Sequence, residues 1–121
     1  MFDDIPAEDV AAAAALATAA AYASAQTTAA EYILAEAAET IGEPIPSAVA
    51  ILLARPQNDP RYRLLKGLEL DWMLLTARIL NGVLRPTEAV KEARRRGATW
   101  TQIGAALNVT PASAQQRFKD V

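Results

Sequence analysis

The polar side chains near residue 115 are suited to recognising a hydrogen-bonding surface. Gln115 and Gln116 each carry an amide that can make a bidentate pair with adenine. The hydroxyl groups of Thr110 and Ser113 can bond to phosphates or to base edges. The chemistry that these residue types offer is therefore binding, and the question is which elements would hold them in place.

The residue types that most catalytic and metal sites require are missing. The 121 residues include no cysteine and no histidine, which excludes disulfides, thiolate metal sites, the commonest general base and the commonest zinc ligand. The acidic residues are scattered over expected helix exteriors and helix starts, and the sequence has no glycine-rich phosphate loop. We expect no enzyme activity, no catalytic residues, no metal and no cofactor.

Charge is distributed unevenly along the chain. Residues 1–84 contain 11 acids and 5 bases, a balance of −6, whereas residues 85–121 contain 3 acids and 7 bases, a balance of +4. Residues 1–43 hold eight acids and no lysine or arginine, so this segment would approach a polyanion only at an electrostatic cost. Any contact with nucleic acid is expected from residues 85–121.

The sequence predicts an all-α fold, a small helical bundle with a long alanine-rich helix near its start. Alanine, leucine and glutamate dominate, and no long stretch alternates with period two. The first helix is expected over residues 6–41, unbroken or kinked near residues 27 and 28, with Gly42 just past its end. A second helix over residues 47–54 is wholly apolar and is expected to be buried on all sides.

A third helix is expected to begin after Asp59, which can cap it, with Pro60 in the first position. Apolar residues then recur at spacings of four, four, three and four, which places them in one stripe: Leu64, Leu68, Trp72, Leu75 and Ile79. We expect this stripe to belong to the core. Asn81 and Gly82 are expected to close the helix.

A fourth helix is expected over residues 86–96, with Gly97 ending it. Its three consecutive arginines cannot share one face, because successive residues of a helix are turned about 100° apart. By themselves they fit a solvated helix end, where cations lie at the negative pole of the helix dipole. The residues after Gly97, however, favour a binding role for these arginines.

The stretch "GATWTQIGAALNVTPASAQQRF" predicts two short helices joined by a tight turn. Thr99 and Gln102 form a capping box that starts a helix at Trp100. Asn108 suits a left-handed turn residue, and Thr110 caps a second helix with Pro111 in its first position. The residues expected to face inward are Ile103, Leu107, Val109, Ala114 and Phe118.

This stretch resembles the helix-turn-helix of phage repressors, bacterial regulators and the promoter-reading region of sigma factors. It is also similar to short regulators of high-GC Gram-positive bacteria and their phages, in which a pattern close to G-A-S-W-x-x-I-G-x-A-L-G-V-S-x-x-A-x-x-R-F recurs. The resemblance covers about 30 of the 121 residues. It departs at Asn108, where the motif usually has glycine, and at Arg117, where many repressors keep an apolar residue and Phe118 takes the packing role here.

The resemblance implies a C-terminal helix-turn-helix that binds double-stranded DNA, with residues 111–119 as the recognition helix in the major groove. The residues implied to contact bases are Thr110, Pro111, Ala112, Ser113, Gln115 and Gln116. The residues implied to contact phosphates are Arg94, Arg95, Arg96, Thr99, Thr101, Gln102, Arg117 and Lys119. Helix pairs of this shape also occur as plain packing units, which is the alternative interpretation of the motif.

The chain is expected to divide into an acidic helical association region, residues 1–84, and a DNA-binding region, residues 85–121. One recognition helix makes few contacts, so we expect a homodimer formed through the N-terminal helices, acting as a transcriptional regulator. The alanine-rich helix could equally pack within its own chain. An alternative function is an adaptor whose acidic helices dock on a partner protein, with little direct DNA binding.

Residues 1–10 are acidic and lack the basic segment of a secretory signal, and polar residues interrupt the alanine-rich run after them. We expect no membrane association. A cytoplasmic location is the expected setting.

Overall fold

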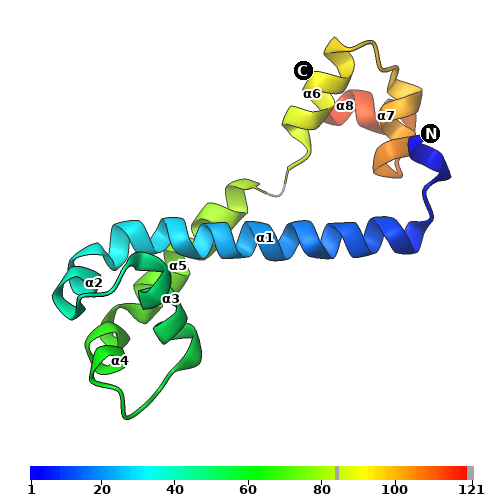
Figure 1. Cartoon of the computed structure of the whole chain (residues 1–121). Helices are drawn as coiled ribbons and strands as arrows, with labels where there is room; N and C mark the ends of the chain where they lie inside the picture. The colour runs from blue at the N-terminus through cyan, green and yellow to red at the C-terminus, as the bar shows by residue number, and fades with distance from the viewer. Residues whose placement is uncertain (84, 120–121) are drawn as a thin grey trace. The chain divides into compact units, whose positions relative to one another are not determined.

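The computed structural model describes residues 1–83 and 85–119, and the chain is all-α over this range, as the sequence predicts (Figure 1). A short 3₁₀ helix, η1 (Phe2–Asp4), precedes the long helix α1 (Ala7–Ile33). The remaining elements are α2 (Ala35–Ile41), α3 (Ile45–Ala54), α4 (Pro60–Leu65), the 3₁₀ turn η2 (Lys66–Leu68), α5 (Glu69–Val83), α6 (Thr87–Arg95), α7 (Trp100–Leu107) and α8 (Pro111–Arg117).

The described residues form two compact units. The central unit comprises Ala15–Val83, and the terminal unit combines residues 1–14 with residues 85–119. The central unit ends at Val83, and residues 1–14 group with the C-terminal helices. The division of tasks between residues 1–84 and 85–121 remains a prediction, and residues 84, 120 and 121 lie outside the described part.

The first expected helix is divided in two, and the expected kink site is wrong. Residues 27 and 28 lie within α1, whereas the break falls at Leu34, whose φ of −106° and ψ of −2° separate α1 from α2. The Leu34 side chain is fully buried in the core of the central unit. Gly42 ends α2 in the left-handed conformation, with φ of 70°, as expected.

Helix α3 begins two residues earlier than expected and is not buried on all sides. Pro44 is its N-cap, and a proline is tolerated in its first turn, where no backbone N–H is needed. Val49, Ile51 and Leu52 are buried, whereas Leu53 is 54% exposed. One face of this helix, which is apolar except for Ser47, therefore remains at the surface.

The expected third helix is interrupted by η2. Asp59 caps α4 as predicted, but the 3₁₀ turn changes the helical phase, so Leu65 is buried and Leu64 is 54% exposed. From Leu68 onward the predicted stripe faces the core, with Trp72 buried and Leu68, Leu75 and Ile79 packed beside it. The expected end at Asn81 and Gly82 is also wrong, since α5 continues to Val83.

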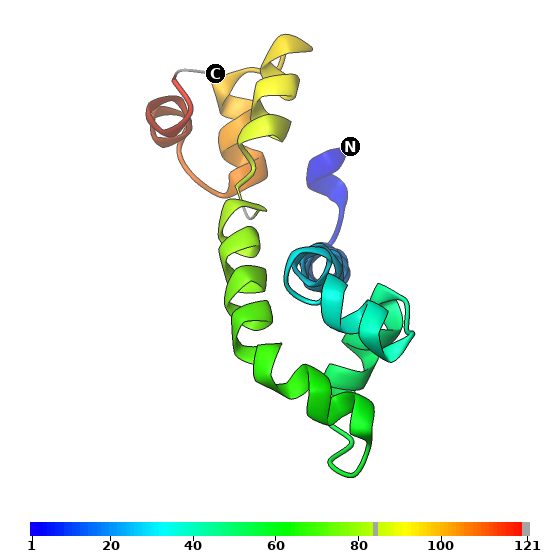
Figure 2. The ribbon, with the colours of Figure 1, turned by 90° about the vertical axis from the view of Figure 1, so that its left-hand side faces the viewer.

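Helix α5 crosses α1 within the central unit, where Trp72 joins them (Figures 1 and 2). The indole Nε1 of Trp72 donates a hydrogen bond of 2.9 Å to the backbone oxygen of Gln26. Nearby, the hydroxyl of Tyr22 lies 3.3 Å from the sulfur of Met73. The N-terminal part of α1 is exposed, and these contacts attach its C-terminal part to α5.

A polar network connects the start of α4 to Glu43, which follows α2 in the central unit. Arg61 donates to the Asp59 carboxylate through its backbone N–H at 2.9 Å and its Nη2 at 2.8 Å, and to Glu43 Oε1 at 2.7 Å. The hydrogen bonds from the Arg61 side chain and backbone hold the pKa of Asp59 below its ordinary value. Because the folded state depresses this pKa, the stabilisation is present at neutral pH and is lost as the pH falls through that lowered pKa.

No single helix in residues 1–83 and 85–119 combines the length and the apolar character needed to cross a membrane. The pair α2 and α3, which meets at an 89° bend, passes the same criteria of length and composition only when the two helices are taken together.

Candidate nucleic-acid interface

The start of α7 is built by the predicted capping box. The Thr99 hydroxyl oxygen accepts the backbone N–H of Gln102 at 3.1 Å, and the Gln102 side-chain oxygen accepts the backbone N–H of Thr99 at 2.9 Å. Two backbone donors of the first turn are thereby satisfied locally. Gly97, with φ of 99°, ends the preceding helix segment and lets the chain turn into this cap.

The junction between α7 and α8 also agrees with the prediction. Asn108 adopts the left-handed conformation, with φ of 57° and ψ of 43°. The Thr110 hydroxyl then accepts the backbone N–H of Ser113 at 3.0 Å, and Pro111 occupies the first turn of α8. The local sequence thus specifies both ends of the turn.

Gly104 allows the turn to lie directly against α7. A Cβ atom at this position would lie 2.7 Å from the backbone oxygen of Val109 and 3.1 Å from the backbone nitrogen of Pro111. Since both neighbours are backbone atoms, an added methyl group could be accommodated only by moving the turn. The close approach of the two helices therefore depends on glycine.

A small hydrophobic core holds this helix pair to α6. Its buried members are Val90, Ile103, Ala114 and Phe118, and Leu107 and Val109 pack against them. The inward positions expected from the sequence are all in this core or at its edge. Phe118 is 6% exposed and Arg117 is exposed, so the packing role falls to Phe118 as expected.

The outer side of α8 and its N-cap present the predicted base-contacting residues to solvent. All six are exposed: Thr110, Pro111, Ala112, Ser113, Gln115 and Gln116. Gln115 and Gln116 are adjacent in sequence and lie in the last turn of α8. The structure brings together these polar groups on one short helix, while their contact with DNA remains a prediction.

The arginines at the end of α6 have partners within the chain. Arg94 donates from Nη1 to the backbone oxygen of Ala98 at 2.9 Å, and its guanidinium carbon lies 4.6 Å from the centre of the Trp100 ring. Arg96 pairs with Glu92 at 2.9 Å, and Arg95 lies 3.7 Å from the same carboxylate. Arg94 therefore connects α6 to α7, whereas the highly exposed Arg95 and Arg96 share one acidic neighbour.

The other residues predicted to contact phosphates differ in whether their polar side-chain groups already have a partner within the chain. Thr99 and Gln102 already use their side chains in the capping box, whereas Thr101 is simply exposed. The Arg117 guanidinium lies 5.2 Å from the centre of the Phe118 ring. Lys119 is exposed and lies beyond the end of α8.

Two features of this region escaped the sequence analysis. The pairing of Glu92 with Arg95 and Arg96 has the i, i+3 and i, i+4 spacing, which could have predicted it. The packing of η1 against α7 could not have been found this way, because about 100 residues separate the two segments and no local pattern connects them.

Comparisons of the chain with protein-family models, with curated proteins and with solved structures find no match.

Proposed function

We propose that the chain binds double-stranded DNA in a sequence-specific manner through α7 and α8, as a transcriptional regulator that acts as a homodimer. The observation that carries this proposal is the exposed outer side of α8. Its amide and hydroxyl side chains stand on a helix whose opposite side is held by Ala114 and Phe118 in a defined core. A helix held in this way can enter a major groove and present its side chains to base edges.

Electrostatics support the same surface. Residues 85–121 contain seven bases and three acids, a balance of +4. Arg95, Arg96, Arg117 and Lys119 are exposed, and phosphate neutralisation by such groups supplies much of the affinity of DNA-binding proteins. Because Glu92 partly neutralises Arg95 and Arg96, we expect moderate affinity for a single chain and a need for two half-sites.

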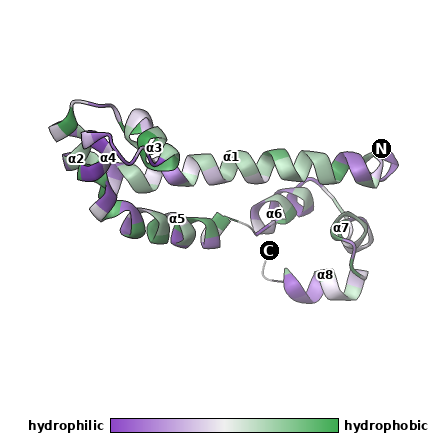
Figure 3. Ribbon diagram, turned by 90° about the horizontal axis from the view of Figure 1, so that it is seen from below, coloured by the Kyte–Doolittle hydropathy of each residue, from purple (hydrophilic) through white to green (hydrophobic). Residues whose placement is uncertain are grey.

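The long helix supports self-association. Residues 7–20 of α1 are exposed, and residues 10–30 contain no charged side chain. Figure 3 shows this apolar character along most of α1, with hydrophilic residues near its start. Small residues let two helix axes approach closely, and a second copy of α1 would remove this alanine surface from water. A two-fold axis at α1 would supply two copies of α8 for a repeated site.

Neutralising Arg95 and Arg96 together, as R95Q and R96Q, should weaken binding to all duplex sequences alike. The slope of log affinity against log salt should fall by about 0.9 for each phosphate that the protein no longer neutralises. Fluorescence anisotropy with a random duplex at several salt concentrations measures both quantities. Arg94 is kept because its contacts with Ala98 and Trp100 are structural.

The charge-matched control is the double substitution R63Q and R78Q. Both arginines belong to the central unit and are also exposed. An equal reduction of affinity and slope in the two double variants would contradict a specific phosphate contact by the end of α6.

Replacing Gln116 with alanine should affect sequence choice more than general affinity. Removing a bidentate contact costs about 1–3 kcal/mol at the preferred site and much less on random DNA. The preferred site is first selected from a random duplex pool, and the affinities for both duplexes are then compared. Equal reductions on the two would mean that α8 does not read bases.

Replacing Leu16 with glutamate should convert the dimer into monomers at micromolar concentration. Leu16 is 74% exposed, so within one chain the charge meets water, whereas between two α1 helices it would be buried at a high cost. Light scattering gives the mass of each species. A wild-type chain that is monomeric both alone and on a duplex with two half-sites would exclude the dimer.

A second candidate function, an adaptor that docks on a partner protein, is supported by the apolar surface of the central unit. Leu53, Leu70 and Leu74 are 54%, 69% and 59% exposed, and Leu53 and Leu70 line an open hollow of about 380 Å³ with Trp72 and Met73. Such a surface is typical of protein–protein contact sites. Replacing Leu74 with glutamate is the matched control for Leu16→Glu. If only Leu74→Glu changes the assembly state, the chain self-associates through α5 and not through α1.

A further inference from the structure

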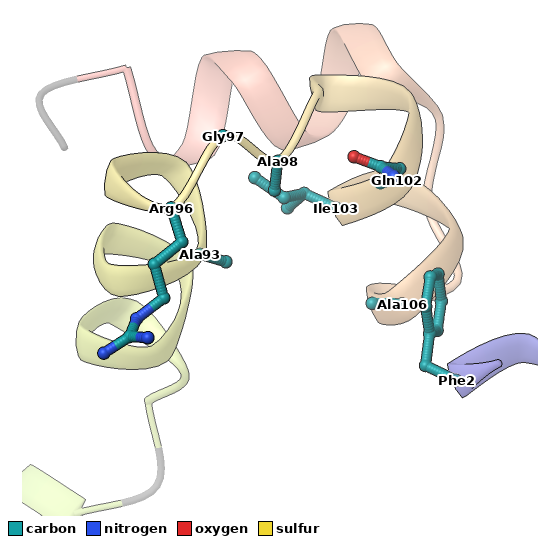
Figure 4. A pocket seen from close by; sticks show the side chains of 8 residues that line it. All are labelled: Phe2, Ala93, Arg96, Gly97, Ala98, Gln102, Ile103 and Ala106. Atoms are coloured by element: carbon teal, nitrogen blue, oxygen red, sulfur yellow. The ribbon is translucent and has the colours of Figure 1, made fainter.

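The first residues of the chain pack against α7 in the terminal unit. Phe2 of η1 lines a hollow of about 430 Å³ together with Ile103 and Ala106 of α7 and with Ala93 and Ala98 (Figure 4). Five of its eight lining residues carry apolar side chains, and one of these is an aromatic side chain from a distant part of the sequence. The N-terminal segment has a specific contact on the helix pair.

The same hollow includes two of the predicted phosphate contacts. Gln102 and Arg96 are among its lining residues, and Gln102 lies one helical turn before Ala106 on α7. A DNA backbone that reaches the start of α7 would therefore approach the surface on which η1 lies. The two cannot use this surface independently.

The docked segment carries the wrong charge for a DNA surface. Asp3 and Asp4 come directly after Phe2. Both carboxylates pair with the Met1 ammonium, and their side chains remain 69% and 82% exposed. Since neighbouring Cα atoms are about 3.8 Å apart, both carboxylates stay within about one Debye length of the Phe2 anchor at physiological salt. With Glu8 and Asp9, residues 1–14 bring four acidic side chains to the terminal unit, which reduces its side-chain charge balance from +4 to 0.

We infer that residues 1–6 act as an internal competitor of DNA, in which Phe2 anchors the segment on α7 and holds the Asp3 and Asp4 carboxylates beside the surface that DNA phosphates would approach. This inference rests on the proposed function. Binding of a duplex displaces the segment, so the affinity measured for the chain is lower than the intrinsic affinity of α7 and α8. The segment lowers the affinity for a preferred site and for random DNA by the same factor, because either duplex must displace it.

The experiment compares three variants of the full chain for binding to a random duplex at low salt. The double substitution D3N and D4N should raise the affinity about threefold to tenfold, because it removes two negative charges beside the phosphate surface. The double substitution E8Q and D9N removes the same net charge from the first turn of α1, outside the docked segment. It should raise the affinity for the random duplex less than D3N and D4N do. Phe2→Ala changes no charge and should raise the affinity by releasing the anchor.

Methyl resonances of Ile103 and Ala106 report the docking without DNA. They should shift in Phe2→Ala and in wild-type protein on addition of duplex. Equal increases of affinity in the two charge variants would overturn the inference in favour of general repulsion, and unchanged methyl resonances in Phe2→Ala would overturn the anchor. If neither the wild type nor any variant binds a duplex, both the proposed function and the competition are excluded. If all of them bind DNA with equal affinity, only the competition is excluded.

Discussion

Replacing Trp72 with alanine is expected to lower the free energy of unfolding of the central unit by about 3–5 kcal/mol. Trp72 is 3% exposed and packs in a core that includes Leu34, Leu52 and Leu65. The substitution leaves a cavity and removes the hydrogen bond of 2.9 Å to the backbone oxygen of Gln26, which joins α5 to α1. Urea unfolding followed by far-UV circular dichroism measures the change.

Leu74→Ala is the matched control for this substitution. Leu74 lies two residues further along α5 and is 59% exposed, so its truncation removes little buried surface. We expect its unfolding midpoint to stay close to that of the wild type. A similar shift in both variants would mean that α5 does not pack through Trp72.

Replacing Gly104 with alanine is expected to lower the free energy of unfolding of the terminal unit by about 3 kcal/mol, at the upper end of the range for overpacked substitutions. The added Cβ would lie 2.7 Å from the Val109 oxygen, and the turn that must then move also carries the Thr110 cap. Amide hydrogen exchange measured by mass spectrometry should speed up in peptides that cover α7 and α8. If the proposed function holds, affinity for DNA falls as well.

Gly82→Ala serves as the control for Gly104. Gly82 also lies in a helix, but a Cβ there meets no atom within 4 Å. Alanine is the better helix former, so this variant should be as stable as the wild type or slightly more stable. If amide hydrogens of α7 and α8 exchange as slowly in Gly104→Ala as in Gly82→Ala, the turn does not lie as close to Gly104 as the structure shows.

The helix ends that use side-chain caps could be predicted from the sequence because their causes are local. Asp59, Thr99 and Thr110 each accept a backbone N–H two or three residues ahead, and Gly42 and Asn108 adopt the left-handed conformation. Each of these features depends on a few consecutive residues. The same locality explains why the exposed side of α8 could be predicted in detail.

The helix interruptions were predicted wrongly because their causes are distant. Leu34 leaves the helical path while its side chain is buried among residues of other elements, and η2 changes the phase so that Leu65, and not Leu64, reaches the core. Two adjacent leucines, such as Leu64 and Leu65, support either phase equally well. Only the residues packed against such a run can select one of them.

By itself, therefore, the sequence determined the all-α class, the helix caps, the tight turn before α8 and the excess of positive charge in residues 85–119, since each depends on composition or on neighbours a few residues apart. Only the tertiary structure decided that α1 ends at Ile33, that Leu53 stays exposed, and that Phe2 lies against α7. The physical reason is that these features depend on which surfaces meet when the helices pack, and packing joins residues that no sequence spacing connects.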